Sequence, residues 1–329
     1  MEKPQKTYVN LKENISNSIE LAQSNVIKSI NSELVLRNWN IGKHIVEFEQ
    51  GGESRAVYGA ETLKRLAVDL TVEYGKGFTL RNLEQFRKFH TLFEKTHALD
   101  AKLSWTNIKH LLSVKDENKR KFYTIECRSN NWSSRELERQ INSQLYDRLL
   151  MSKDKDKVLE MSKLGQVIEK PSDLIRDPII LDFLNLKEEP SYSEKEVESK
   201  IIDRLQDFLL ELGKGFTFVS RQYRITLDNV NYYADLVFFN RFLKCFVVIE
   251  LKIGKVKPEH LGQLQFYVNY FNKYEKTDFE NKTIGILVCE EKNSAVVKLS
   301  LPENNEHIFA VEYKKYLPSE KELQKIINE

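Results

Sequence analysis

Two neighbouring apolar runs in the last third of the chain carry ionisable side chains where a β-strand would be buried. The first run is Tyr232–Phe239, which contains Asp235, and the second is Cys245–Lys252, which ends in Glu250-x-Lys252. Both runs are rich in aromatic and β-branched residues and predict strands. An ionised group in such a strand costs several kcal/mol unless it is paired or bound to a metal. This part of the chain must therefore fold so that its charged groups meet.

A hairpin would bring these groups together. Side chains alternate along a strand, so Glu250 and Lys252 point to the same face. The loop of residues 240–244 is short enough for a hairpin, which places Asp235 close to Glu250. Two carboxylates and the backbone carbonyl of Leu251 make an oxygen site that suits Mg²⁺ or Mn²⁺. The residues predict metal-assisted hydrolysis of a phosphodiester, with Lys252 orienting the attacking water or stabilising a phosphate oxygen.

The order Asp, gap, Glu-x-Lys on a hairpin resembles the PD-(D/E)xK nuclease superfamily, the fold of many restriction enzymes and junction resolvases. The usual proline before the aspartate is Ala234 here, which leaves the ligands untouched. Longer strings resemble the YhcG-type bacterial nuclease family, which joins an uncharacterised N-terminal domain to a C-terminal PD-(D/E)xK domain. These strings are Ile249–Gly254, Lys257–Gln263 and Phe266–Tyr267, with Trp39–Gly42, Gly77–Leu83, Leu103–Trp105 and Gln144–Tyr146 in the N-terminal half.

The resemblance implies an all-α N-terminal domain and an α/β restriction-endonuclease-like domain with the element order α-β-β-β-α-β. It makes Lys252 the catalytic lysine and adds two residues to the site. Glu198, on the first helix of the core, would complete the metal site, with a solvated surface charge as the alternative. Gln263, on the helix after the catalytic strand, would face the site and contact the scissile phosphate or a water. His260 and Tyr267 share its helical face, where a surface role and a core role are the simpler interpretations.

Length and composition predict two domains joined by a linker. We expect residues 1–150 to form the helical domain, residues 151–190 the linker and residues 191–329 the nuclease domain. Alternating Lys and Asp at 153–157 mark the linker, and its apolar centre at 178–184 is expected to pack on a domain as a short helix. The first 150 residues hold 24 Lys and Arg against 19 Asp and Glu, and the remainder holds 27 against 30. The basic excess of the first part fits nucleic-acid contact, and equally a solvated helical surface.

Apolar periodicity predicts the individual elements. In the first domain we expect two helices within residues 10–50, and helices over 60–74, 79–93, 105–112, 116–127 and 134–150. In the last domain we expect one helix over 194–212, strands over 216–225, 231–239, 245–252, 283–290 and 306–313, a helix over 258–274 and a closing helix over 319–327.

Residues 60–93 have the outline of a helix-turn-helix, with a glycine-containing turn and Thr79 as the expected cap of the second helix. The second helix carries the predicted DNA contacts, whose types suit phosphates and base edges: Arg81, Asn82, Gln85, Arg87 and Lys88. An ordinary surface helix is the alternative. Lys255 and Lys257, just after the catalytic strand, would grip the phosphate backbone or remain solvated loop charges.

Together these features predict a Mg²⁺-dependent deoxyribonuclease acting in DNA restriction, repair or mobile-element defence. DNA is favoured over RNA because similar RNA-cleaving folds typically use a His-containing site without metal. A homodimer is expected if one site per chain cuts both strands of a duplex. The alternatives are a nucleic-acid binder that does not cleave, and a subunit that docks onto a restriction or defence complex.

Several other classes are disfavoured. The sequence has no run of 18 apolar residues and no apolar segment near its N-terminus, so neither a membrane protein nor a signal peptide is expected. The cysteines Cys127, Cys245 and Cys289 lie far apart and favour a reduced, cytoplasmic environment. The six histidines show no zinc spacing, and no phosphate-binding loop of an ATP motor occurs.

Overall fold

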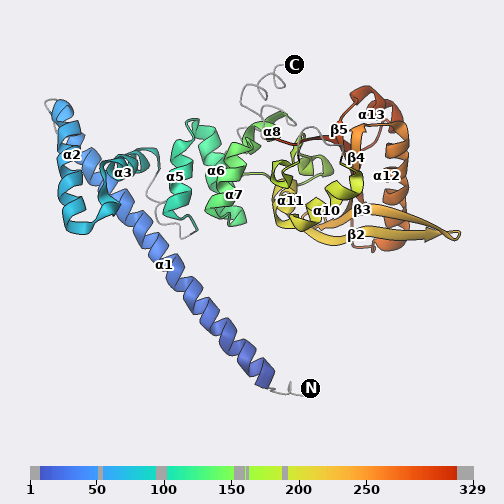
Figure 1. Cartoon of the computed structure of the whole chain (residues 1–329), viewed down its shortest axis with the longest axis horizontal. Helices are drawn as coiled ribbons and strands as arrows, with labels where there is room; N and C mark the ends of the chain where they lie inside the picture. Colours follow the sequence, from blue (N-terminus) through green and yellow to red (C-terminus); the bar gives the residue numbers. More distant parts are fainter. Residues whose placement is uncertain are drawn as a thin grey trace. The chain divides into compact units, whose positions relative to one another are not determined.

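The computed structural model describes residues 8–50, 55–93, 102–151, 160, 163–186 and 192–316, whose helices and strands are drawn in Figure 1. The chain separates into two compact units, Met1–Glu138 and Arg139–Glu329. Every described element of the first unit is helical, whereas the second unit holds a mixed sheet flanked by helices. The predicted fold class, an all-α region followed by an α/β domain, is confirmed.

The first unit contains α1 (Tyr8–Gln50), α2 (Arg55–Tyr74), the 3-10 turn η1 (Lys76–Phe78), α3 (Leu80–Leu92), α5 (Trp105–Ser113) and α6 (Glu117–Asn130), and α7 (Ser134–Asn142) crosses the division. The two helices expected within residues 10–50 are one continuous helix, so that expectation is wrong. A Cβ atom at Gly42 of α1 would lie 2.0 Å from the carbonyl oxygen of Phe86 in α3. This glycine permits the close crossing of α1 and α3 and does not end the helix.

The apolar faces predicted for α2 and α3 form the core of the first unit. Leu63 and Ala67 of α2 pack with Leu83 and Phe86 of α3 and with Ile45 of α1. Burying one such large apolar side chain contributes roughly 1.5–3 kcal/mol. The helical spacing of these residues was sufficient to find the core of this unit.

The six described strands of the second unit follow the order β1-β6-β5-β4-β3-β2. They are β1 (Ile179–Ile180), β2 (Phe216–Leu227), β3 (Val230–Asn240), β4 (Cys245–Lys255), β5 (Ile284–Glu291) and β6 (Ile308–Lys314). Strands β2, β3 and β4 form an antiparallel meander, and β5, β6 and β1 extend the sheet through parallel pairs. All strands except β1 were predicted from the sequence.

Two helices that were predicted to be continuous in this unit are each divided into two shorter helices. The helices of this unit are α8 (Leu145–Met151), α10 (Glu194–Asp203), α11 (Leu205–Leu212), α12 (Pro258–Tyr270) with a π turn (Phe271–Glu275), and α13 (Ser294–Ser300). The helix expected over 134–150 is interrupted at Gln144, whose φ is 52°. The helix expected over 194–212 is interrupted at Arg204, whose φ of −119° is not helical. Helix α13 was not predicted, and the closing helix over 319–327 lies outside the described residues.

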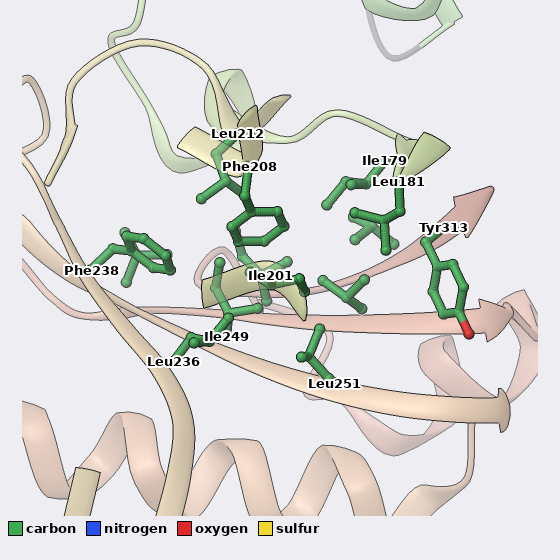
Figure 2. Packing of buried hydrophobic residues seen from close by; sticks show 14 of the residues in the cluster. Ile179, Leu181, Ile201, Phe208, Leu212, Leu236, Phe238, Ile249, Leu251 and Tyr313 are labelled. Carbon is green, nitrogen blue, oxygen red and sulfur yellow. The ribbon is translucent and has the colours of Figure 1, made fainter. Parts of the chain in front are cut away.

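The sheet is covered on both faces. On one face, Ile201 of α10 and Phe208 of α11 pack against Leu236 and Phe238 of β3, as Figure 2 shows. On the other face, Val237 of β3 packs in a cluster that includes the buried side of α12. Residues 236, 237 and 238 thus alternate between the faces, which is the period that the sequence predicted for a buried strand.

Part of the predicted linker of residues 151–190 belongs to the second unit. Its described residues include the 3-10 turn η2 (Pro171–Leu174), the strand β1 and the 3-10 turn η3 (Asp182–Leu184). Ile179 pairs with Tyr313 of β6, and Leu181 is fully buried in the core of the sheet. The apolar centre of the segment therefore packs as expected, but as a strand and a 3-10 turn instead of a short helix.

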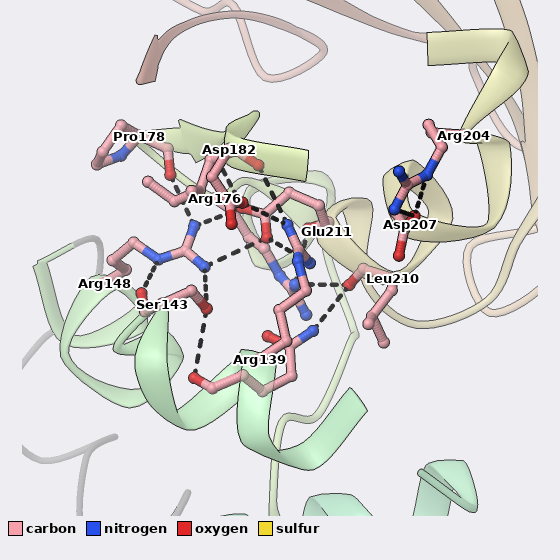
Figure 3. A network of polar contacts seen from close by, with 12 residues as sticks. Arg139, Ser143, Arg148, Arg176, Pro178, Asp182, Arg204, Asp207, Leu210 and Glu211 are labelled. Atoms are coloured by element: carbon pink, nitrogen blue, oxygen red, sulfur yellow. Dashed lines mark hydrogen bonds and ion pairs between the residues drawn. The ribbon is translucent and has the colours of Figure 1, made fainter. Parts of the chain in front are cut away.

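A buried ion-pair network ties residues 139–148 to the same unit (Figure 3). The guanidinium of Arg148 donates to Oε1 of Glu211 at 2.5 Å and to the carbonyl oxygen of Pro178 at 2.9 Å. Arg148 and Glu211 are both fully buried, and Arg139 adds a contact of 3.5 Å to Oε2 of Glu211. Burial opposes the ionisation of Glu211, but the charge and hydrogen bond of Arg148, with the charges of Arg176 and Arg139, together outweigh burial and lower the pKa of this carboxyl. The second unit therefore begins before the boundary predicted at residue 150.

Candidate active site

The predicted carboxylates meet where strands β3 and β4 part. The last paired residues of this ladder are Leu236 and Ile249, so Asp235 and Glu250 follow directly on opposite strands. The N–H of Asp235 donates to Oε1 of Glu250 at 3.1 Å, and the N–H of Leu251 donates to Oδ2 of Asp235 at 2.9 Å. Each carboxylate thus accepts a hydrogen bond from the backbone of the other strand. The structure brings these two residues together as the hairpin geometry predicted.

Burial raises the pKa of both carboxyl groups. Glu250 is fully buried, and burial together with the charge of Asp235 raises its pKa from 4.5 to about 8. Burial also raises the pKa of Asp235. The Oε2 atom of Glu250 is buried and has no hydrogen-bond partner among the described residues. A positive charge placed between these groups would favour their ionised forms.

Lys252 lies on the same side of β4 as Glu250 and is held by two carboxylates. Its Nζ atom donates to Oε2 of Glu194 at 3.0 Å and lies 3.8 Å from Oε2 of Glu250. Burial opposes the charge of Lys252, but the hydrogen bond to Glu194 and the charge of Glu250 outweigh burial and raise its pKa. The lysine is therefore an ammonium ion at neutral pH. Glu194 was not predicted as a partner of Lys252. It lies at the N-terminus of α10, and no local sequence pattern indicates a contact between the start of a helix and a distant strand.

Glu198 is connected to the site through one side chain. The amide of Gln222 on β2 donates to Oε2 of Glu198 and, at 3.0 Å, to Oδ1 of Asp235. Arg221 pairs with Oε1 of Glu198, which is 2% exposed. Glu198 is therefore a buried, bridged group, and the alternative of a solvated surface charge is wrong. Whether it binds metal stays a prediction.

Gln222 is a residue of the site that sequence reasoning missed. Its φ of 48° is unusual for a non-glycine residue, and it lies between the pairs Arg221–Leu236 and Tyr223–Ala234, where the ladder skips one position. The backbone turn aims its amide at the two carboxylates. A glutamine within an exposed, alternating strand gives no signal of this conformation, so the sequence could not have indicated it.

The predicted face of α12 lies beside the site. The amide of Gln263 donates to the hydroxyl of Tyr267 at 2.9 Å, and this hydroxyl donates to the carbonyl oxygen of Tyr233 at 2.9 Å. Burial raises the pKa of Tyr267, with a smaller contribution from the charge of Glu250, and burial and the charge of Lys252 lower that of His260. Tyr267 is buried as expected, and Gln263 contacts no carboxylate of the site directly.

The donor set fits a hard cation bound by few protein ligands. In a strand, the N–H and C=O of one residue point the same way, so the carbonyl of Leu251 faces the side where its N–H meets Asp235. This carbonyl, the carboxylate of Asp235 and the free oxygen of Glu250 are oxygen donors of the kind that Mg²⁺ prefers. Within the described residues, no cluster of three or more His, Cys, Asp and Glu side chains is arranged to hold a metal. Mg²⁺ usually keeps several waters, which would complete the coordination of such an ion.

The predicted DNA contacts on α3 have different environments. Arg87 pairs with Glu49 of α1 at 2.8 Å, and Nζ of Lys88 donates to the carbonyl oxygen of Leu112 at 2.6 Å. Both side chains thus support the helical packing of their unit. Three further residues complete the predicted set: Arg81 is exposed, Asn82 donates to the carbonyl oxygen of Gly77, and Gln85 is half-buried. Their contact with DNA stays a prediction.

The helix-turn-helix outline predicted for residues 60–93 is present as α2, η1 and α3. Thr79 stands at the N-terminus of α3, but its side chain makes no capping hydrogen bond.

Lys255 and Lys257 in the second unit are exposed. Lys255 pairs with Glu291 at 2.9 Å, and Lys257 with Glu259 at 3.4 Å. Exposed pairs of this kind contribute little to stability. Contact of these lysines with DNA stays a prediction.

The fold and the site define a nuclease domain of the PD-(D/E)xK class. The family described as "YhcG PDDEXK nuclease domain" matches residues 172–328, and "DUF1016 N-terminal domain" matches residues 14–148. The chain belongs to the YhcG nuclease family: it is 36% identical to "Putative nuclease YhcG" of Escherichia coli (strain K12), over 96% of this chain and 92% of that protein. The resemblance read from the sequence is confirmed.

Solved structures give a more distant likeness. The chain is similar to a repair endonuclease from Pyrococcus abyssi, with 19% identity and a TM-score of 0.29. It is also similar to EndoMS in the complex titled EndoMS-dsDNA2, with 22% identity and a TM-score of 0.28. Each match covers 40% of this chain and 50% and 48% of the other chains, so the chain spans about half their length.

Among the helices in the described ranges, none combines the length and the apolar character that crossing a bilayer requires.

Proposed function

We propose that the chain is a Mg²⁺-dependent nuclease that hydrolyses phosphodiester bonds of DNA. The observation that carries this proposal is the buried Oε2 atom of Glu250, which lacks a hydrogen-bond partner among the described residues. An ionised carboxylate in that position costs several kcal/mol unless a cation neutralises it. Lys252 reaches this oxygen at 3.8 Å and makes its shorter contact with Glu194. A divalent cation would neutralise the group more completely.

In this proposal Asp235, Glu250 and the carbonyl of Leu251 hold the metal, and Glu198 supports Asp235 through the amide of Gln222. A bound divalent ion supplies positive charge for the phosphate oxygens and lowers the pKa of water. Mn²⁺ could replace Mg²⁺, because both prefer carboxylate and carbonyl oxygens.

The residues around the metal ligands have their own tasks. The ammonium of Lys252, kept charged by Glu194 and Glu250, donates a hydrogen bond to the attacking water or to a phosphate oxygen. The hydrogen bonds from Gln263 to Tyr267 and from Tyr267 to the carbonyl oxygen of Tyr233 hold these side chains against β3. There they would position the scissile phosphate. Water attacks phosphorus, the sugar oxygen leaves, and the two products carry a phosphate and a hydroxyl end.

DNA is the proposed substrate because the site offers carboxylates and a lysine for metal-dependent cleavage. Lys255 and Lys257 follow the catalytic strand and have exposed charges for the phosphate backbone, and Arg81 exposes its side chain on α3. A role in restriction, repair or defence, and any partner of such a system, belong to this proposal and rest on the nuclease class alone.

The test is cleavage of labelled single-stranded, duplex and branched DNA, with a matched RNA panel, in the presence of Mg²⁺ or of a chelator. Glu250→Gln should reduce cleavage at least about 100-fold, because a bound ion contributes several kcal/mol of transition-state stabilisation and 1.4 kcal/mol is tenfold. Asp235→Asn and Lys252→Gln should behave similarly while the circular dichroism spectrum stays unchanged.

The matched control is Asp278→Asn, an exposed carboxylate in the loop before β5. It should cleave as fast as the wild type. Equal cleavage by wild type and Glu250→Gln would refute the proposed site. Tight DNA binding without turnover in either metal would instead support the non-cleaving alternative, and preferential cleavage of RNA would correct the substrate.

A further inference from the structure

The first part of α1 presents an apolar stripe outside the core of its unit. Ile15, Ile19, Val26 and Ile30 are each more than half exposed, whereas Val35, where the packed part of the helix begins, is fully buried. Figure 1 shows this part of α1 extending beyond α2 and α3. Helical segments of this kind are marginal in water unless their apolar face is packed. A contiguous exposed apolar surface on a soluble domain marks an interaction site.

The stripe residues share one face of the helix, because Ile15, Ile19, Ala22, Val26 and Ile30 are separated by four, three, four and four residues. The four large residues alone are spaced by four, seven and four, which is the same from either end. Ile15 and Ile30 lie equally far from the centre of the stripe beside Ala22, and so do Ile19 and Val26. When two identical helices pack antiparallel about a two-fold axis, residue i contacts residue j and j contacts i. This arrangement pairs Ile15 with Ile30 and Ile19 with Val26, twice each.

The charges at the two ends of the stripe select the orientation. Lys12 and Glu33 are exposed, lie on the side of the stripe and are also equidistant from its centre. Antiparallel pairing places Lys12 of each copy beside Glu33 of the other. Parallel pairing in register would place lysine beside lysine and glutamate beside glutamate, which is unfavourable. The segment is therefore complementary to an inverted copy of itself.

We propose that residues 12–33 of α1 form an antiparallel helix pair with the same segment of a second copy of this chain. The segment of residues 12–33 is about 33 Å long at 1.5 Å per residue, and its apolar stripe would be covered in the pair. The spacing of eleven residues from Ile15 to Val26 and from Ile19 to Ile30 keeps the contact nearly straight. The pair would form whether or not the chain cleaves DNA.

The test is the mass of the full chain by sedimentation equilibrium over a wide range of protein concentrations. The wild type should be a dimer. Ile19→Glu should raise the dimer dissociation constant at least about 100-fold, because the pair would then bury two unpaired carboxylates. Leu21→Glu is the matched control: Leu21 is 62% exposed on the same helix, two residues away and on another face. It should leave the dimer unchanged, and circular dichroism should show equal helix content in both variants.

A charge exchange tests the orientation. Lys12→Glu alone and Glu33→Lys alone should each weaken the dimer up to about tenfold, and the double exchange should restore it. A wild type that stays monomeric at all concentrations, or a dimer that survives Ile19→Glu, would overturn the proposal. Equal dissociation by Leu21→Glu would do the same. A double exchange that fails to restore the dimer would exclude the antiparallel orientation.

Discussion

Two glutamates of the second unit are equally buried and have opposite surroundings. Glu211 and Glu250 are both fully inaccessible to solvent. Glu211 receives the guanidinium of Arg148 at 2.5 Å and the N–H of Ile180 at 2.9 Å, and its pKa is lowered. Glu250 has one oxygen without a hydrogen-bond partner among the described residues, and its pKa is raised to about 8.

The different partners of Glu211 and Glu250 show that a carboxylate can be buried in a core for two different reasons. Glu211 is neutralised by the protein itself and therefore serves the fold. Glu250 has one oxygen without a hydrogen-bond partner among the described residues, and its raised pKa disfavours the ionised form until a ligand completes it. Burial alone would rank the two residues equally. The count of partners at each oxygen distinguishes the structural glutamate from the proposed catalytic one.

The largest effect is expected from removing the partner of Glu211. Arg148→Met keeps the length of the side chain but leaves a buried carboxylate without its main counter-charge. Loss of one member of a buried pair costs about 3–5 kcal/mol. Urea unfolding should show this loss of free energy, with no dependence on Mg²⁺.

The matched control for Arg148→Met is Arg204→Met, because Arg204 pairs with Asp207 at the surface and is half exposed (Figure 3). This variant should lose less than about 1 kcal/mol. If both variants were equally stable, the network around Glu211 would contribute nothing to folding, and the contrast with Glu250 would lose its meaning.

A smaller effect is expected when Mg²⁺ is added to the folded chain. At a concentration of about 100 times its dissociation constant, a ligand that binds the native state adds about 2.7 kcal/mol to the free energy of unfolding. The wild type and Asp278→Asn should gain this stability, and Glu250→Gln should not. Thermal unfolding with and without Mg²⁺ measures the gain independently of cleavage. An identical gain in Glu250→Gln would place the metal elsewhere.

A further effect is a dependence of stability on pH in the absence of divalent ions. The pKa of Glu250 is about 8 in the native state and 4.5 for an ordinary glutamate. Between these values the native state binds a proton that the unfolded state has lost, so stability falls as pH rises, by up to about 1.4 kcal/mol per unit. Glu250→Gln removes this loss and should become more stable than the wild type near pH 8.

Glu211 makes the free energy of unfolding depend on pH in the opposite direction. Because its native pKa is lowered, its contribution to stability is present above the ordinary pKa of a glutamate and is lost as pH falls further. Stability curves against pH for the wild type and Glu250→Gln should therefore agree below about pH 4.5 and diverge between about pH 4.5 and 8. Parallel curves across this range would contradict the raised pKa.

The sequence predicted those parts of the fold that depend on local periodicity. Strands β3 and β4 were found because their apolar residues are continuous, and Asp235, Glu250 and Lys252 were found because charges interrupt them. Their mutual contacts follow from the hairpin, which is a local structure. The carbonyl of Leu251 was predicted for the same reason.

The missed features depend on residues that are distant in the sequence or on unusual backbone angles. Glu194 meets Lys252 only because α10 starts beside β4, and Gln222 reaches Asp235 only because its φ is positive. Strand β1 has two residues and pairs with the far edge of the sheet, so its period is too short to detect. Tertiary packing, and not local preference, determines each of these.

The segment of residues 139–148 belongs by sequence to the family domain that matches residues 14–148, yet its arginines neutralise a glutamate of the second unit. A gene fusion that exchanged the N-terminal domain at the family boundary would remove Arg139 and Arg148, two of the three arginines whose charges favour the ionised form of Glu211. The two halves of this chain are therefore expected to be inherited together.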